Sequence, residues 1–304
     1  MTAPGEIDAI AVVAALGAAA AFGVGAALEQ SEAKQEKQAQ PLDPRLLLRL
    51  VRRPKWLLAW LPEGLGTGLQ AVALSYGPLI LVEPMLITGQ FLAIPLSVAL
   101  NRRRSHARDY LVVVLGGAGL AAFLLAAQPR AGVDEPTTDG WLGVALWAGP
   151  VLAACLIGGW WAAGAARAVL LGIASGLLYG VAASLLKALT AQLSREPIGI
   201  FTRWQTYALV VVGLGAVVLN QDAFQTSRIA MPLTAITVMD PAVGVAIGIT
   251  AFHEQISTTG PRLTIEVLAV LVMVGAVWLA STTHSDMRRQ QPGDGRASPA
   301  PESL

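Results

Sequence analysis

Long apolar stretches alternate with short polar segments along most of this 304-residue chain. Nine of the stretches are close to the roughly 20 residues that an α-helix needs to cross a hydrocarbon core of about 30 Å. This repeated length predicts an all-α fold, a polytopic membrane bundle of about nine transmembrane helices. We expect these helices at residues 7–28, 56–76, 79–100, 109–127, 141–161, 168–189, 205–220, 229–252 and 263–280.

The composition agrees with a chain that lies in the bilayer. Hydrophobic residues make up 54% of the sequence and charged residues only 13%, whereas soluble domains carry about 25% charged residues. The mean hydropathy is +0.58. A formal net charge of +1 gives no reason to expect a nucleic-acid partner. The single cysteine, Cys155, lies in an apolar stretch, where helix packing explains it more simply than chemistry does.

The N-terminal stretch predicts a retained helix rather than a signal peptide. It is preceded by Glu6 and Asp8 without any Lys or Arg, and it is longer than the apolar core of a signal peptide. The second and third helices are separated only by Gly77 and Pro78, which predicts a tight hairpin turn between them.

The distribution of basic residues predicts the orientation, because Lys and Arg remain on the cytoplasmic side of a membrane. With nine helices, sixteen basic residues fall on one set of connections and four on the other, and Lys187 lies within a helix. The larger set is Lys34, Lys37, Arg45, Arg49, Arg52, Arg53, Lys55, Arg102, Arg103, Arg104, Arg108, Arg167, Arg228, Arg288, Arg289 and Arg296, and the smaller is Arg130, Arg195, Arg203 and Arg262. We therefore expect a multi-pass protein of the cell membrane with its N-terminus outside and its C-terminus in the cytoplasm.

Two polar segments outside the helices have distinctive compositions. Residues 44–55 are basic and amphipathic, which fits either a helix at the inner headgroup surface or a simple determinant of topology. Residues 285–304 are rich in Pro, Gly, Ser and charge, which predicts a disordered cytoplasmic tail.

Parts of the chain match one another at an offset of 157 residues. Residues 22–28 align with residues 179–185, and Glu83-Pro84 aligns with Asp240-Pro241. An odd number of helices between the copies would make them inverted repeats, as in many transporters. The alternative is that Ala- and Gly-rich helices resemble one another by composition. The repeat predicts four helices in residues 1–127, a connecting helix at 141–161 and four further helices in residues 168–283.

The chain resembles the drug/metabolite transporter superfamily, and within it the NIPA-like branch named for magnesium transport. The first part of this resemblance lies in Gly66, Gln70, Ala73, Pro78, Leu81, Val82 and Pro84. The second part lies in residues 219–227, Pro232 and His253-Glu254. Gln70 stands where that branch carries Asn, and Thr67 stands where it carries an acidic residue. The resemblance implies an alternating-access carrier of a small solute or a divalent cation such as Mg²⁺.

Ionisable residues inside predicted helices are the main candidates for a binding site, because an unpaired charge at that depth costs at least about 2.5 kcal/mol. Glu63, Glu83 and Asp240 could supply the oxygen ligands that a hard cation such as magnesium requires. For Glu63 and Glu83, a side chain that snorkels to the lipid headgroups is as good an explanation as a binding role. Asp240 lies deeper in its predicted helix, so we favour a functional role for it. Lys187 would be a counter-ion or, as we expect, would reach outward to the headgroups.

A second group of polar residues lies near the predicted helix ends. Gln70 belongs with the leading candidates for the binding site, and Asn220 and Asp222 are secondary candidates. Interhelical hydrogen bonds would explain all three residues without transport. His253 and Glu254 end the eighth helix on the predicted outer side, where they would either recruit cations or form a boundary pair in water. No metal ligand set follows from the sequence.

These features favour transport over catalysis. The histidines lie at helix boundaries, and the sequence contains no H-E-x-x-H, G-x-S-x-G or phosphate-loop motif, so we expect neither an enzyme nor a bound cofactor. We expect the partners to be a small-molecule or cation substrate and the lipid bilayer. A non-transporting scaffold or sensor and an exporter of organic metabolites or drugs are the alternatives, and the oligomeric state does not follow from the sequence.

Overall fold

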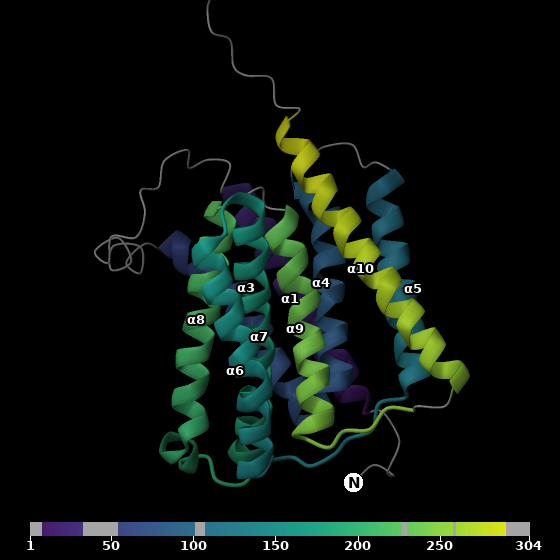
Figure 1. Ribbon diagram of the computed structural model, residues 1–304. Helices are drawn as coiled ribbons and strands as arrows, with labels where there is room; N and C mark the ends of the chain where they lie inside the picture. The colour runs from purple at the N-terminus through teal and green to yellow at the C-terminus, as the bar shows by residue number, and fades with distance from the viewer. Residues whose placement is uncertain (1–7, 33–53, 101–106, 227–229, 258–259, 290–304) are drawn as a thin grey trace, which may run out of the picture.

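The described residues form a bundle of α-helices (Figure 1). The computed structural model describes residues 8–32, 54–100, 107–226, 230–257 and 260–289. The α-helices of these residues are α1 (Ala9–Glu32), α3 (Pro54–Tyr76), α4 (Leu79–Leu100), α5 (Ala107–Ala127), α6 (Thr138–Trp161), α7 (Gly164–Leu193), α8 (Trp204–Thr226), α9 (Ala230–Thr250) and α10 (Gly260–Arg289). A short 3-10 helix, η1 (Gly199–Thr202), precedes α8.

The predicted apolar stretches each coincide with a helix, and the two-residue turn at Gly77 and Pro78 is confirmed. The prediction was wrong for residues 285–289, which continue α10 instead of beginning a disordered tail. No proline or glycine interrupts the chain between Ala280 and Arg289, so nothing local ends the helix there. Residues 33–53 and 290–304 lie outside the described residues, and most of the predicted amphipathic segment and the rest of the tail fall within them.

Six of the described helices are long and apolar enough to cross a membrane, which indicates a membrane-embedded protein. They are α5, α6, α7, α8, α9 and α10. Large apolar side chains cover their outer surfaces, as in Trp160 of α6, which is 86% exposed, and Val211 of α8, which is 70% exposed. Small residues such as Ala15 and Ala18 are buried between helices instead. An apolar exterior and helix contacts that include small residues are the packing expected in lipid.

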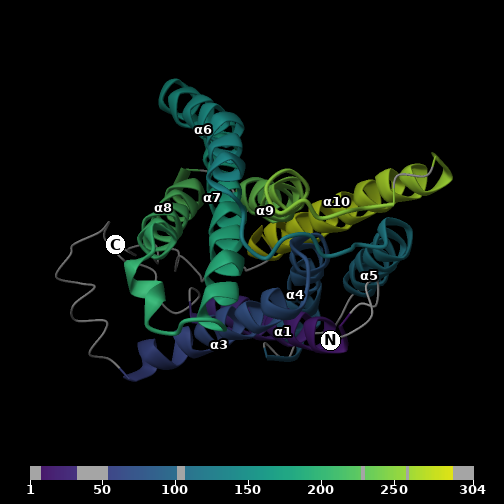
Figure 2. The same ribbon diagram turned by 90° about the horizontal axis from the view of Figure 1, so that it is seen from below.

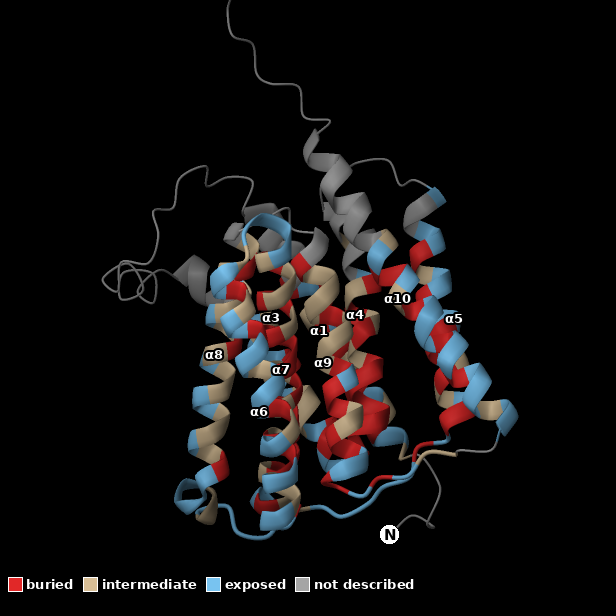
Figure 3. Ribbon diagram, in the orientation of Figure 1, coloured by how far each residue is buried: buried red, intermediate tan, exposed pale blue. Residues whose placement is uncertain are grey.

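Helix α7 lies at the centre of one part of the bundle, between α8 and α9, and α6 projects outward past it (Figure 2). Three glycines at four-residue intervals, Gly172, Gly176 and Gly180, form the face of α7 that packs on α9. An added Cβ at Gly176 would lie 2.8 Å from the carbonyl oxygen of Ile236, so the two backbones are in direct contact. Buried residues are densest on α4, α7 and α1 (Figure 3), so these helices contribute most of the core of the protein.

One end of the bundle, which we call the loop end, holds the connections from α5 to α6, from α7 to α8 and from α9 to α10 (Figure 1). Two of these connections, residues 128–137 and 251–257, are the paired loops. Arg130 and Gln255 exchange two backbone hydrogen bonds of 2.9 and 3.2 Å, and Val133 N donates to Phe252 O at 2.7 Å. Gly132 permits this approach, because an added Cβ would overlap the Phe252 carbonyl oxygen.

Candidate functional site

Glu83 and Asp240, which we call the acid pair, meet where α4 packs against α9. Glu83 lies in the second turn of α4 and is only 1% exposed. Asp240 lies in the middle of α9, one helical turn before Gly244, which packs directly on the Glu83 side chain. Gln70 of α3 donates from Nε2 to Glu83 Oε1 at 3.1 Å. Three of the four leading sequence candidates therefore form one cluster contributed by three helices.

Glycines let the helices approach closely around the acid pair. An added Cβ at Gly244, one turn beyond Asp240 on α9, would lie 2.5 Å from Glu83 Cγ. On the α7 side, an added Cβ at Gly180 would lie 2.7 Å from the backbone oxygen of Asp240. Pro241 also lacks the N–H to which the Thr237 carbonyl would otherwise bond within α9. The acid pair is therefore enclosed by close backbone contacts.

The surroundings of the acid pair offer its two carboxyl groups little charge compensation. Among the described residues, no ion pair joins Glu83 or Asp240 to a basic side chain. Asp240 Oδ1 is buried and has no hydrogen-bond partner there either. Because burying uncompensated carboxylates is costly, this arrangement favours a bound proton or cation at the acid pair.

Glu63 lies apart from the acid pair. It is seven residues, or about 10 Å along a helix, from Gln70 on α3, and its carboxylate faces α1, where an added Cβ at Gly25 would lie 2.6 Å from Oε1. Its backbone oxygen accepts a 2.9 Å hydrogen bond from Thr67. Across the part of the chain that the structure describes, no three His, Cys, Asp or Glu side chains are grouped to hold a metal ion. Glu63, Glu83 and Asp240 are thus not one ligand set.

Lys187 and Glu254 form a buried ion pair, which we call the gate pair, and this corrects two expectations. Lys187 does not reach out to the headgroups, because its ammonium pairs with Glu254 and donates to Gly77 O at 3.3 Å. Glu254 is not a boundary residue in water, since its side chain is 0% exposed. The chain turns back at His253, whose φ is +53°, and Glu254 N donates to Gly248 O at 2.8 Å. This reversal directs the Glu254 carboxylate into the bundle.

The remaining candidates lie outside both pairs. Asn220 Nδ2 of α8 is 3.5 Å from the Tyr179 hydroxyl of α7, which fits the interhelical hydrogen bond that the sequence allowed. Asp222 forms a half-exposed ion pair with Arg167 at 3.1 Å, which links the end of α8 to the start of α7. His253 is exposed at the loop end.

Sequence reasoning missed the backbone groups and glycines that complete these sites. Glu254 accepts hydrogen bonds from Leu79 N at 2.8 Å and Ile80 N at 3.0 Å, the first amides of α4. Gly248 makes room for it, because an added Cβ would lie 2.6 Å from Glu254 Oε2. The four-residue spacing of Gly244 and Gly248 is typical of close helix packing, but nothing in that spacing indicates that the neighbouring side chains are carboxylates.

The fold and these sites define a polytopic helical membrane protein with two buried charged clusters. The chain is 25% identical over 245 residues to an uncharacterized protein of Corynebacterium glutamicum, an alignment that covers 79% of this chain and 83% of that protein. No protein-family model matches the chain. No solved structure matches it.

Proposed function

We propose that this membrane protein is a secondary carrier that moves a small cationic solute or a divalent cation by alternating access. The observation that carries the proposal is the acid pair, two carboxylates without a basic partner among the described residues. A charge in the middle of a membrane helix needs a compensating proton, ion or solute. A carrier uses such a residue as its binding site, whereas a scaffold has no reason to retain it.

The contacts between helices agree with an inverted repeat, which we include in the proposal. In the contact pattern, α1 packs on α3 and α4, and α7 packs on α8 and α9 in the same way. The last helices of the two proposed halves, α5 and α10, pack on each other. We assign the halves to residues 1–127 and 168–283, with the helix at 141–161 as connector, so that α4 and α9 are equivalent.

The acid pair has a special position within this repeat. Residues that lie near a two-fold axis contact their own equivalents. Glu83 and Asp240 are aligned with each other by the sequence match at offset 157, and they also lie near each other in space, since Gly244, one turn from Asp240, packs on Glu83. A binding site at the interface of the halves is the arrangement that alternating access requires, because rocking one half against the other then exposes the site to each side in turn.

The chemistry of the acid pair favours a cation as the transported species. Magnesium is a suitable cargo, because it keeps several waters and takes only one or two carboxylates. This agrees with the resemblance to the NIPA-like branch of the drug/metabolite transporters. We infer from the basic residues that the loop end faces outward and that the C-terminus is cytoplasmic.

Flux measurements in liposomes test the carrier proposal. Purified protein is assayed with Mg²⁺ and with a panel of organic amines and neutral metabolites. We expect flux of one cationic species, and we expect Glu83→Gln and Asp240→Asn each to reduce it at least about tenfold, a change of about 1.4 kcal/mol in transition-state or binding free energy. Glu196→Gln and Asp139→Asn are matched controls, because both side chains are exposed.

The alternatives predict different results. An organic-metabolite exporter would move a panel compound but not Mg²⁺, and its flux would be insensitive to both acid-pair variants if that compound is neutral. A scaffold or sensor would move no solute in protein shown to be folded and inserted, and this outcome would remove the carrier proposal.

A further inference from the structure

Glu254 ties the paired loops to the first turn of α4. Its two carboxylate oxygens accept hydrogen bonds from the N–H groups of Leu79 and Ile80, which are among those that a helix start leaves without internal partners. The negative charge also lies at the positive end of the α4 dipole. Glu254 follows α9 in the chain, so this contact joins the two proposed halves at the loop end.

Lys187 of α7 adds a third element to the contact between Glu254 and α4. Its ammonium pairs with Glu254, donates to the Gly77 carbonyl at 3.3 Å and lies 5.0 Å from the centre of the Phe252 ring. One ammonium and one carboxylate therefore connect the turn between α3 and α4, the last third of α7 and the paired loops. Both side chains are almost completely removed from solvent, with exposures of 8% and 0%.

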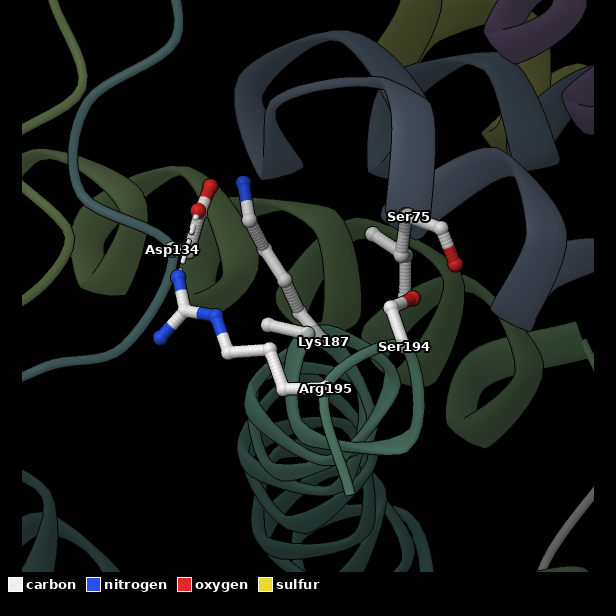
Figure 4. A pocket seen from close by; sticks show the side chains of 7 residues that line it. Ser75, Asp134, Lys187, Ser194 and Arg195 are labelled. Carbon is white, nitrogen blue, oxygen red and sulfur yellow. Dashed lines mark hydrogen bonds and ion pairs between the residues drawn. The ribbon is translucent and has the colours of Figure 1, made fainter. Parts of the chain in front are cut away.

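The gate pair lies between a surface pocket and the acid pair. The pocket has a volume of about 160 Å³ and is lined by Leu74, Ser75, Asp134, Lys187, Ala191, Ser194 and Arg195. Lys187 rises from α7 between Ser75 on one side and the ion pair of Asp134 and Arg195 on the other (Figure 4). On the inner side, Glu83 is one helical turn, or about 6 Å along α4, from Leu79 and Ile80, whose amides bind Glu254.

We propose that the gate pair is the closed outer gate of the carrier, and that the pocket is the vestibule through which a solute reaches it. This inference rests on the proposed function. Opening requires Lys187 to leave Glu254 and Gly77, so that α7 can separate from the start of α4. Since an isolated buried charge is expensive, the two groups separate only as water enters from the vestibule. The gate therefore has two states: closed, with water excluded from the ion pair, or open, with water around both separated charges.

Thiol labelling tests the gate without any transported solute. Cys155→Ala removes the only cysteine. A reporter, Ala73→Cys, is then placed one turn of α3 inside Gly77, at a side chain that is 0% exposed. Ser194→Cys, at the pocket, identifies the side from which a membrane-impermeant maleimide enters. We expect Ser194→Cys to react rapidly and Ala73→Cys to be protected while Lys187 and Glu254 are intact.

Neutralising the gate pair should expose the reporter. In Lys187→Met/Glu254→Gln, the glutamine keeps one oxygen for the α4 amides, and we expect Ala73→Cys to react at least about tenfold faster, a population shift of about 1.4 kcal/mol. Gly248→Ala is a second variant with both charges present, because the added Cβ would displace Glu254. Arg195→Met/Asp134→Asn is the matched control, since it neutralises the exposed ion pair of the same pocket.

The outcomes separate the gate from the carrier. The gate proposal is overturned if Ala73→Cys stays protected in both gate variants while Ser194→Cys still reacts. This holds even if solute flux is observed. Equal exposure in the Arg195→Met/Asp134→Asn control also overturns it, because the effect would then come from general loosening of the pocket. Selective exposure in the gate variants together with no flux of any solute would retain the closure at this position and overturn the proposed transport.

Discussion

Glu83 on α4 lies directly against Gly244 on α9, so closely that a Cβ added to the glycine would come within 2.5 Å of Glu83 Cγ. The carboxylate of Glu83 is held between this glycine and the amide of Gln70. The position of one ionisable group therefore depends on the absence of a single methyl group on the opposite helix.

Gly244→Ala should destabilise the protein and reduce the proposed cation flux. The added methyl group overpacks the contact between α4 and α9, which typically costs about 1–3 kcal/mol, and it displaces Glu83 from Asp240. Thermal unfolding followed by tryptophan fluorescence measures the first effect, and flux in liposomes measures the second. Gly275→Ala on α10 is the control, because an added Cβ there meets no atom within 4 Å. An unchanged thermal unfolding midpoint for Gly244→Ala would contradict this, because it would show that α4 and α9 accept the methyl group without loss of stability.

Exchanging the charges of the gate pair should not restore stability. Breaking a buried ion pair costs about 3–5 kcal/mol, and we expect Lys187→Glu/Glu254→Lys to unfold at least as readily as either single variant. Lysine has no acceptor for the amides of Leu79 and Ile80, and glutamate cannot donate to Gly77 O. The same exchange at Arg195 and Asp134, whose side chains are 62% and 70% exposed, should cost at most about 1 kcal/mol. A rescued double exchange would mean that the hydrogen bonds to α4 contribute little.

Gly132→Ala should separate the paired loops. The new methyl group would overlap the Phe252 carbonyl oxygen and lie 2.6 Å from the His253 carbonyl carbon. We expect amide hydrogen exchange at Arg130, Val133 and Gln255 to accelerate about tenfold, which is a local loss of about 1.4 kcal/mol. Exchange measured by mass spectrometry in detergent reports this directly. Gly143→Ala, with no atom within 4 Å of its added Cβ, should leave the same amides unchanged.

The orientation predicted from the basic residues can be measured with two single cysteines. In the Cys155→Ala background, Ser194→Cys lies at the loop end and Ala163→Cys lies in the turn between α6 and α7 at the opposite end (Figure 1). We expect an impermeant maleimide to label Ser194→Cys in intact cells and Ala163→Cys only after permeabilisation. Reversed labelling would invert the proposed topology. Labelling of both from one side would contradict a membrane crossing by α7.

The positions of the helices could be predicted from the sequence because each stretch carries its own length and composition. The apolar run at 79–100 has the same limits as α4, since Pro78 precedes it and charged residues follow it. The end of α10 could not be predicted in this way, because the polar residues after Ala280 are compatible with a helix as well as with a tail.

The candidate sites were only partly predictable. Glu83 and Asp240 stood out because charges are rare in membrane helices, and the internal match aligned them with each other. The gate pair could not be found in this way, since Lys187 and Glu254 are 67 residues apart and the reversal of the chain at His253 is needed to bring them together. In the sequence, Glu63 is as good a candidate as Glu83, because both are glutamates within predicted helices. The structure distinguishes them, since the Glu63 carboxylate faces α1 and not α9.

The hydrogen bonds of Glu254 to α4 have a consequence for biosynthesis. The residue that completes the first turn of α4 is made 175 positions after Leu79, an interval of roughly 10–35 s at ordinary rates of translation. During that time the hairpin of α3 and α4 has no permanent acceptor for its leading amides, and those groups must stay hydrated or be shielded by the insertion machinery. The start of α4 therefore cannot complete its final hydrogen bonds until Glu254 has been synthesised.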